Sequence, residues 1–404
     1  MRLLWMKSDY VLPPDTGGKI RTYNLMRELN KLCEVTYLAF KGDDSPNNEP
    51  EIATCATDVV TVVRPEENKS GVGFYSRVLR GLASQLPYIL QKYRSSKIVG
   101  HQRNFVRADG KPPVVLCDFL EMAENVDWSL PCPKVLFQHN VESMIWDRYY
   151  STETNPLKKA YFNYERKRMA RYEAEACNRF DLVFTVSEED RHTLRNRFGV
   201  TCPIEVLETG VDTDFFQPLP NHAPTPGRLT FLGSMDWMPN IDGVRWFVDE
   251  VLPLVRKQFP SASLDIVGRR PGSEIRRMAE KAPAINVIAD VPDVRPHIAN
   301  SDVFIVPLRI GGGSRIKIYE AMAMDRPVVS TTIGAEGLPV VADQHIAIGD
   351  TPAEFAGQVV QLLQDSERRQ SISRSGYEFV TQNHQWKNVA AKLLDHCLEL
   401  ANRP

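Results

Sequence analysis

At Gly311-Gly312-Gly313-Ser314-Arg315-Ile316-Lys317-Ile318-Tyr319-Glu320, three glycines and two cations closely follow the apolar run Val303 to Leu308. The pattern predicts a buried strand, a glycine turn and a helix that begins with positive charge. Consecutive glycines let a ligand approach the backbone closely, and Ser314 is a favourable N-cap. Unpaired amides at a helix start favour an anion, and Arg315 and Lys317 add charge to them. The segment therefore predicts a phosphate site; an ordinary strand-to-helix corner with an ion pair inside the helix is the alternative.

Length and composition indicate an ordinary globular protein with two domains. The chain has 404 residues, too many for one typical core. It is 43% hydrophobic and 25% charged, with a formal net charge of -2. It lacks the broad positive field of a nucleic-acid binder, so nucleic acid is not an expected partner.

The cysteines and histidines predict neither a disulfide framework nor a metal site. The seven cysteines are scattered and never form C-x-x-C, which fits reduced thiols in a cytoplasmic protein. No two histidines have the spacing of a metal-binding pair, and Asp212-Thr213-Asp214 follows the last strand expected in the first domain, away from the second domain's strand ends. The amino-terminal residues Met1 to Met6 form no long apolar signal core, and no run is long enough to predict a membrane-spanning helix.

The amino-terminal half predicts a β-loop-α-β start. Gly17-Gly18 follows the first strand and opens a helix that carries Arg21. In open α/β sheets the carboxyl ends of strands bind ligands, so these glycines can approach a phosphate, although paired glycines also make plain turns. Strands are expected at 3–6, 34–40, 59–63, 114–117, 134–138, 182–186 and 204–207.

A second α/β series follows the proline-rich stretch 217–226, which is typical of an interdomain linker. Its expected strands are 229–232, 263–267, 286–289, 303–306, 327–331 and 345–348, and helices are expected at 353–363, 366–382 and 386–401. The alternation predicts an α/β fold with two doubly wound, Rossmann-like domains that face each other across a cleft. We expect a first domain at 1–216, to which the helix 386–404 returns, and a second at 217–385.

Three more strand ends in the second domain carry residues suited to a nucleotide. Gly233 and Ser234 end its first strand, Arg269 ends the second, and Val291 follows the third. Each alone is equally consistent with a tight turn or a solvated side chain. Four successive strand ends with such chemistry favour a nucleotide site over any single alternative.

His139 follows the strand at 134–138, where it can donate a hydrogen bond to a sugar hydroxyl or orient a reacting centre. A buried structural histidine is the alternative.

Two basic stretches with interleaved apolar residues, 75–97 and 158–171, predict contact with an anionic membrane surface or a phosphorylated acceptor. Solvated helical faces are the more common reading of such stretches.

Assembled, these residues resemble family 4 of the nucleotide-sugar glycosyltransferases, whose fold is GT-B. Within it the chain looks most like bacterial enzymes of exopolysaccharide synthesis. The resemblance rests on the Gly17-Gly18 loop, Gly210-Val211-Asp212, Phe231-Leu232-Gly233, Asp302-Val303, Pro307-Leu308, Gly313-Ser314-Arg315-Ile316-Lys317, Glu320-Ala321-Met322-Ala323, Pro327-Val328-Val329 and Gly334-Ala335-Glu336-Gly337.

The resemblance implies a retaining hexosyltransferase that uses a nucleoside diphosphate sugar, with UDP or GDP as the nucleotide, and no tightly bound cofactor or metal. Arg315 and Lys317 match the family's cations that neutralise the leaving diphosphate. Glu320 matches the acid that binds the ribose of the nucleotide, and His139 matches a histidine near the transferred sugar. The donor is also expected to contact Gly17, Gly18, Gly233, Ser234, Arg269, Val291, Gly312, Gly313, Ser314 and Ile316. At Gly312 the family often has a glutamate.

The implied acceptor is a glycan, a lipid-linked molecule or a small molecule, used in the cytoplasm or at the inner face of the membrane. A GT-B sugar-nucleotide epimerase and a catalytically silent scaffold are the alternatives. A dinucleotide-dependent oxidoreductase is disfavoured, because no strand is followed by G-x-G-x-x-G.

Overall fold

The computed structural model describes residues 1–42, 49–64, 81, 84, 86–108, 111–220, 222–310 and 315–403, apart from the side chains of Glu49 and Lys281. The predicted glycine turn at 311–314 and residues 75–80, 82, 83 and 85 of the basic stretch 75–97 lie outside the described residues. The chain divides into two compact units. Unit 1 comprises Met1–Glu208 and Val389–Pro404, and unit 2 comprises Thr209–Asn388.

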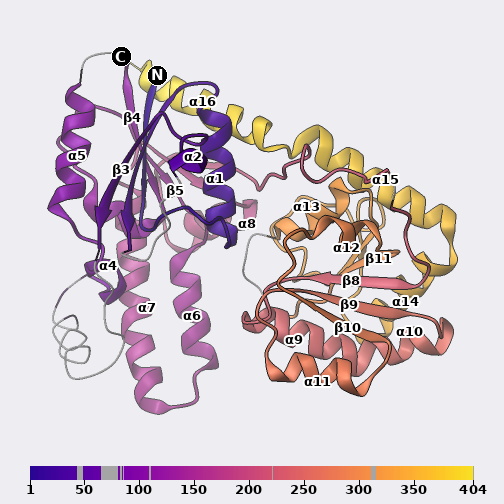
Figure 1. Ribbon diagram of the computed structural model, residues 1–404. Helices are drawn as coiled ribbons and strands as arrows, with labels where there is room; N and C mark the ends of the chain where they lie inside the picture. The colour runs from indigo at the N-terminus through magenta and orange to yellow at the C-terminus, as the bar shows by residue number, and fades with distance from the viewer. Residues whose placement is uncertain are drawn as a thin grey trace. The chain divides into compact units, whose positions relative to one another are not determined.

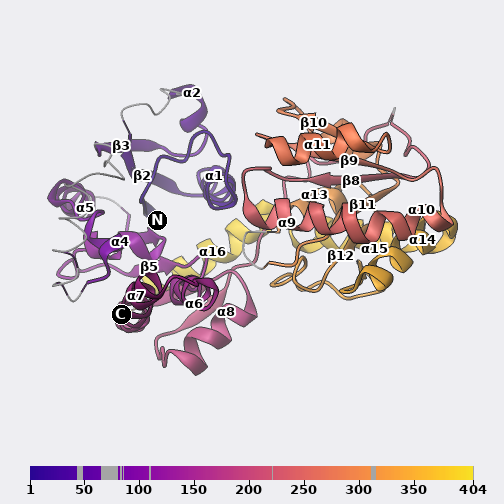
Figure 2. The ribbon, with the colours of Figure 1, turned by 90° about the horizontal axis from the view of Figure 1, so that it is seen from below.

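Unit 1 is built on a seven-stranded parallel sheet with the order β3-β2-β1-β4-β5-β6-β7. Every residue of the central strand β1 is buried, as expected for a parallel sheet covered on both faces. Figure 1 shows α5 on one side of the sheet and α1 on the other, and Figure 2 shows the same arrangement from below. The elements are β1 (Arg2–Lys7), α1 (Gly17–Leu29), β2 (Glu34–Lys41), α2 (Glu49–Ile52), β3 (Asp58–Val63), α4 (Tyr88–Gln91), α5 (Ser96–Arg107), β4 (Pro113–Asp118), η1 (Leu120–Asn125), β5 (Lys134–Phe137), α6 (Glu142–Thr152), α7 (Pro156–Cys177), β6 (Leu182–Thr185), α8 (Glu188–His192), η2 (Thr193–Arg197) and β7 (Ile204–Val206).

Unit 2 is built on a six-stranded parallel sheet with the order β10-β9-β8-β11-β12-β13. Helices α9, α10 and α11 lie on one face, and α12 and α13 lie on the other (Figure 1). The elements are β8 (Arg228–Leu232), α9 (Met238–Trp246), η3 (Phe247–Val251), α10 (Leu252–Gln258), β9 (Ser263–Gly268), α11 (Ser273–Lys281), β10 (Ile285–Ala289), α12 (Arg295–Ala299), β11 (Val303–Val306), α13 (Ile316–Ala323), β12 (Val328–Ser330), β13 (Ala347–Ile348), α14 (Pro352–Gln364) and α15 (Ser366–Asn383).

The predicted strands all form, with ends within two residues of the expected positions. In both sheets the first strand is central: the next two strands add on one side of it, and the later strands add on the other side. The predicted α/β doubly wound fold class is therefore confirmed.

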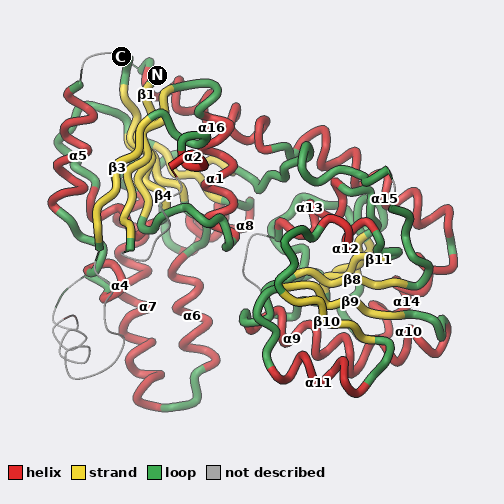
Figure 3. Tube along the Cα trace, viewed as in Figure 1, coloured by secondary structure: helices red, strands yellow, loops and turns green. Residues whose placement is uncertain are grey.

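The last helix, α16 (Trp386–Ala401), begins in unit 2 and ends in unit 1 (Figure 3). Within unit 2, its start lies against the other connection between the units. Val211 pairs with Gln385, and a Cβ atom at Gly210 would lie 2.6 Å from the Trp386 ring. Glycine is therefore required where the two connections pack together.

Among the described helices, none combines the length and the apolar character needed to cross a membrane.

Candidate active site

Each sheet has one topological switch point, where the strands on either side connect in opposite directions. In unit 2 it lies between β8 and β11, and in unit 1 between β1 and β4. Ligands of open α/β sheets bind outside the carboxyl ends of the strands at such points. The residues that follow these four strands are therefore the place to look for chemistry.

At the switch point of unit 2, two glycines allow the backbone and the Lys317 side chain to lie unusually close together. A Cβ atom at Gly268, the last residue of β9, would lie 1.7 Å from the carbonyl oxygen of Gly233. A Cβ atom at Gly233 would lie 2.8 Å from Asn240 Nδ2 and 2.9 Å from Lys317 Nζ. Gly233 therefore leaves the space that the lysine ammonium occupies.

Lys317 is held at this point by two contacts. Its Nζ donates to Asn240 Oδ1 at 3.1 Å and lies 4.5 Å from the centre of the Phe231 ring. Asn240 is itself fixed, since its Nδ2 donates to the carbonyl of Ser234 at 2.8 Å. Burial, followed by the charge of Arg315, lowers the pKa of Lys317 to about 7.

Glu320 lies one helical turn from Lys317 on α13. Burial raises the pKa of its carboxyl group to about 7, against the opposing effect of the Lys317 charge. The two side chains form no ion pair, and the carboxylate accepts no hydrogen bond from any residue in the described part of the chain. The ion pair between Lys317 and Glu320, which the alternative interpretation of this segment required, is therefore not formed.

Arg315 is the N-cap of α13, and Ser314, which was expected to cap the helix, lies outside the described residues. The Arg315 backbone is left-handed, with φ 54°, and its side chain is buried. Nη2 donates to the carbonyl of Ile333 at 2.8 Å and pairs with Glu336 Oε2 at 3.2 Å. The guanidinium is thus fixed by unit 2 before any ligand arrives.

The other residues predicted to bind the donor differ in position. Ser234 Oγ donates to Asp236 Oδ1 at 2.6 Å, so the hydroxyl is engaged in a local turn. Arg269 is exposed after β9, Val291 is half-buried after β10, and Ile316 is buried at the start of α13. Gly312, Gly313 and Ser314 lie outside the described residues.

In unit 1, His139 is bonded to a buried carboxylate. His139 Nε2 lies 2.6 Å from Asp118 Oδ1, and Asp118 Oδ2 accepts from Trp5, Lys7 and Thr22 at 2.9, 3.1 and 2.6 Å. Although burial opposes it, the charges of Lys7 and His139 and these bonds hold the pKa of Asp118 well below its usual range. Because Asp118 is ionised, His139 Nε2 carries the proton.

The other ring nitrogen of His139 faces the glycine loop. Nδ1 is buried and has no partner among the residues the structure describes. It would lie 3.8 Å from a Cβ atom at Gly18, and the His139 ring stacks on Phe119 at 4.0 Å. Burial lowers the pKa of His139 to about 4 despite Asp118, so at neutral pH Nδ1 accepts a hydrogen bond and does not donate one.

A buried glutamate on α7 positions the loop that carries His139. Glu173 accepts from Gln138 Nε2 at 2.9 Å and from the amides of Glu142 and Ser143 at 2.8 and 2.9 Å. The last two are first-turn amides of α6, so Glu173 satisfies donors that would otherwise be unpaired. The loop from 138 to 143 is therefore fixed at both ends of the histidine.

Sequence reasoning missed Asp118, Phe119 and Asn240. Asp118 and Phe119 directly follow a predicted strand, and that position was an available signal. Asn240 had none, since its role depends on contact with Lys317, 77 residues away.

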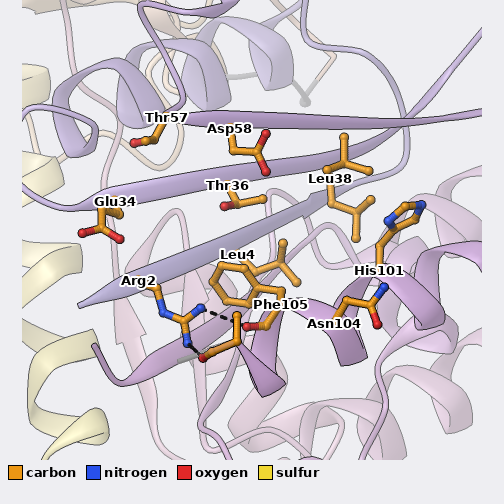
Figure 4. Close-up of a pocket in the computed structure, with 12 residues that line it drawn as sticks. Arg2, Leu4, Glu34, Thr36, Leu38, Thr57, Asp58, His101, Asn104 and Phe105 are labelled. Atoms are coloured by element: carbon orange, nitrogen blue, oxygen red, sulfur yellow. Dashed lines mark hydrogen bonds between the residues drawn. The ribbon is translucent and has the colours of Figure 1, made fainter. Parts of the chain in front are cut away.

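A separate pocket of about 430 Å³ lies at the opposite end of the unit 1 sheet, near the first residues of β1, β2 and β3 (Figure 4). Arg2 on its wall donates to the carbonyls of Phe105 and Ala108 at 3.0 and 2.7 Å. This arginine fixes the end of α5, and the pocket is not at the ligand-binding edge.

The fold is the α/β GT-B fold of nucleotide-sugar glycosyltransferases. Sucrose-phosphate synthase from Thermosynechococcus elongatus superposes with a TM-score of 0.69 at 15% identity over 99% of both chains. Anabaena HepE, solved in complex with UDP, gives a TM-score of 0.68 at 12% identity over 99% of this chain and 100% of its own.

The sequence comparisons identify the family. The model described as Glycosyltransferase Family 4 matches residues 16–215, and the model described as Glycosyl transferases group 1 matches residues 226–365. The chain belongs to glycosyltransferase family 4.

Two curated relatives align with part of the chain. An uncharacterized protein in the cps region of Klebsiella pneumoniae is 24% identical over 64% of this chain and 67% of its own length. A GDP-mannose-dependent alpha-(1-6)-phosphatidylinositol monomannoside mannosyltransferase from Mycobacterium tuberculosis is 28% identical over 53% of this chain and 61% of its own.

Proposed function

We propose that the protein transfers a sugar from a nucleoside diphosphate sugar to a hydroxyl acceptor with retention of anomeric configuration. The observation that carries the proposal is the position of Lys317, beside Gly233 at the switch point of unit 2, with Arg315 and Glu320 on the same helix. In this proposal unit 2 binds the donor and unit 1 the acceptor.

The start of α13 supplies positive charge that can stabilise the leaving diphosphate. When the bond between the anomeric carbon and the phosphate oxygen breaks, its electron pair stays on the diphosphate. The cations Lys317 and Arg315 stabilise that charge, and Arg315 is already fixed by Glu336. The acceptor oxygen then bonds to the anomeric carbon, and its proton passes to the leaving phosphate. Glu320, whose carboxylate has no partner in the described part of the chain, would accept hydrogen bonds from the ribose.

The donor is proposed to be a UDP or GDP sugar. HepE was solved with UDP, and the mycobacterial relative is named for GDP-mannose. A role in polysaccharide synthesis is supported by the relative in the cps region.

Contact with a membrane is proposed for the tip of the α6–α7 hairpin, at the inner face of the cytoplasmic membrane. Of the basic residues in 158–171, Arg168 is buried against Glu165 and Arg166 pairs with Asp147, so neither is free to bind lipid. Leu157 is 82% exposed and Lys158 is exposed beside it. This combination of an apolar and a cationic side chain suits an anionic interface.

The test is to incubate the protein with UDP and GDP sugars, with and without candidate glycan acceptors, and to follow the products by NMR. Transfer with an unchanged anomeric configuration supports the proposal, and inversion refutes the retaining assignment. An isomeric sugar nucleotide formed without acceptor would identify an epimerase. Binding of the nucleotide sugar without transfer or hydrolysis, across the acceptor panel, would favour a silent scaffold.

A further inference from the structure

The pocket at the amino ends of the unit 1 strands is a second place where a ligand can bind. This basal pocket, a cavity of about 430 Å³, lies between α5 and the first residues of β1, β2 and β3 (Figure 4). Its volume falls within the range of about 300–1,000 Å³ that is usual for small-molecule sites. Because it lies at the opposite end of the sheet from the switch point, the proposed transfer reaction does not use it.

The register of the strands builds the floor of the basal pocket. Leu4 pairs with Thr36, and Thr36 pairs with Asp58, so their side chains form a row on one face of the sheet. Two residues further along, and therefore on the same face, Leu38 pairs with Val60. Leu4 and Leu38 are buried, whereas Asp58 on the edge strand β3 is exposed. The floor is therefore apolar and its outer edge is polar.

Helix α5 forms the opposite wall. His101, Asn104 and Phe105 line the pocket, and their spacing of three and four residues places them on one face of the helix. His101 and Asn104 are exposed, and Phe105 is half-buried. Figure 4 shows His101 and Asn104 on the helix side of the space and Thr36 and Asp58 on the strand side. Polar groups thus border the space from both sides.

These polar groups are not engaged within the protein. The side chains of Thr36, His101 and Asn104 make no hydrogen bond or ion pair with any residue in the described part of the chain. Asp58 Oδ1 accepts from the next amide along the chain at 2.9 Å, and Oδ2 has no partner among the same residues. Four side chains from β2, β3 and α5 can therefore bond to a ligand above an apolar floor. A sugar ring, with hydroxyls at its rim and apolar C–H faces, matches this arrangement.

The charges around the basal pocket favour a neutral ligand. Arg2 is the only arginine or lysine among the described residues that line it, and it donates to three backbone carbonyls at 3.0, 3.0 and 2.7 Å. Glu34 pairs with Lys111 at 2.8 Å. The Asp58 carboxylate is then the charge that faces a ligand, and it would repel an anion. The described residues also contain no group of three or more side chains suited to a metal ion.

We propose that the basal pocket binds a neutral sugar unit of the glycan on which the protein acts, away from the site of transfer. The apolar floor packs against a face of the sugar ring, and Asp58, His101 and Asn104 form hydrogen bonds with its hydroxyls. The inference goes beyond the proposed function and rests on it only for the identity of this glycan as the acceptor. A second contact raises the effective concentration of the acceptor near the enzyme between transfers.

The direct test is the binding of neutral disaccharides to the full chain in the absence of nucleotide. Maltose, lactose and mannobiose are titrated by NMR, with glucosamine, glucuronate and octanoate as cationic, anionic and apolar probes. We expect at least one neutral disaccharide to bind the wild type, and the double variant Asp58→Ala, Asn104→Ala to bind it at least tenfold more weakly. The matched control is Arg107→Ala, at an exposed position on α5 outside the pocket, which should bind like the wild type.

The proposal is overturned if no neutral disaccharide binds, if the double variant binds like the wild type, or if a charged or apolar probe binds the pocket more tightly than the neutral sugars.

A kinetic measurement connects the basal pocket with the reaction. For acceptors of increasing length, the KM of the wild type should fall about tenfold once the chain reaches the pocket, with kcat unchanged. The double variant should show no such fall, and the same dependence of KM on length in both proteins would also overturn the proposal. If no acceptor is glycosylated, the proposed function fails, and the disaccharide titrations still test the basal pocket.

Discussion

At the scale of residues, α13 carries a cation and an acid that both titrate near neutral pH. Burial lowers the pKa of Lys317 and raises that of Glu320, each to about 7. A diphosphate would restore the lysine charge, since a nearby anion favours the protonated form. The site is therefore complete only when its ligand is bound.

Replacement of Lys317 by alanine should reduce turnover by about 10²- to 10³-fold, the range for loss of one donor that stabilises transition-state charge. Lys317→Arg should retain more activity, because it keeps the charge. Rates of nucleotide release from the sugar donor measure the effect, and circular dichroism checks the fold. Near-normal turnover by a folded Lys317→Ala protein would refute its role.

The affinity for nucleoside diphosphate should depend on pH in the Glu320→Gln variant, where Lys317 titrates without its acidic neighbour. Because Lys317 has a lowered pKa of about 7 in the free protein, it is charged below that pH and loses its proton above it. Loss of the Glu320 charge lowers this pKa further. Binding should take up a proton and weaken about tenfold per pH unit above the pKa. Calorimetry at several pH values tests this, and Lys317→Arg in the same background should give a flat profile; a flat profile with lysine present would count against the assignment.

A side chain at Gly233 should displace the lysine ammonium. The Cβ atom of Gly233→Ala would lie within 3.0 Å of Lys317 Nζ and Asn240 Nδ2, so we expect nucleotide affinity to fall about tenfold, or about 1.4 kcal/mol. The matched control is Gly357→Ala in α14, where a Cβ atom meets nothing within 4 Å. It should leave binding unchanged and stabilise the fold by about 0.5–1 kcal/mol. Equal binding by both variants would contradict the model of the site.

The individual site residues were only partly predictable. Lys317, Glu320 and Gly233 carry signals in the local sequence, because a turn, two cations and an acid at helical spacing are visible without a fold. Asn240 and Asp118 act through partners 77 and 21 residues away, so only tertiary packing brings them to the site. His139 was expected to donate a hydrogen bond to a sugar hydroxyl or to orient a reacting centre, and its bond to Asp118, which leaves Nδ1 as the acceptor, had no signal in the local sequence.

At the scale of elements, strands were predicted well because parallel strands buried on both faces form continuous apolar runs. The start of α13 was less predictable. Arg315, the N-cap, adopts a left-handed backbone, which is uncommon for a residue other than glycine and has no signal in the local sequence.

The hairpin of α6 and α7 should bind vesicles that contain anionic lipid and not neutral ones. Lys158→Glu should weaken this binding, since each lysine near such a surface contributes about 1 kcal/mol and reversal of charge adds repulsion. Lys257→Glu, an equal charge change at an exposed position on α10, is the control. Cosedimentation is the measurement. The hairpin is not the contact if the wild type fails to bind or if both variants lose binding equally.

At the scale of the whole molecule, two sheets of similar topology carry different chemistry at equivalent positions. The switch point of unit 2 holds a cation of lowered pKa and a carboxylate that has no partner among the residues the structure describes. That of unit 1 holds a neutral histidine bonded to a buried carboxylate. The two-sheet architecture could be predicted from the alternation of strands and helices in the sequence. The different chemistry of the two switch points could not, because it depends on side-chain contacts between distant residues.

The central claim is that the switch point of unit 2 binds the diphosphate of a nucleotide sugar. Thermal unfolding of the wild type and Lys317→Ala, each with UDP, GDP, ADP and TDP, tests it most directly, because a ligand of the native state raises the melting temperature. We expect at least one nucleotide to raise it in the wild type and to have little effect on Lys317→Ala. The claim is contradicted if none of the four stabilises the wild type, or if the stabilisation is undiminished without the lysine.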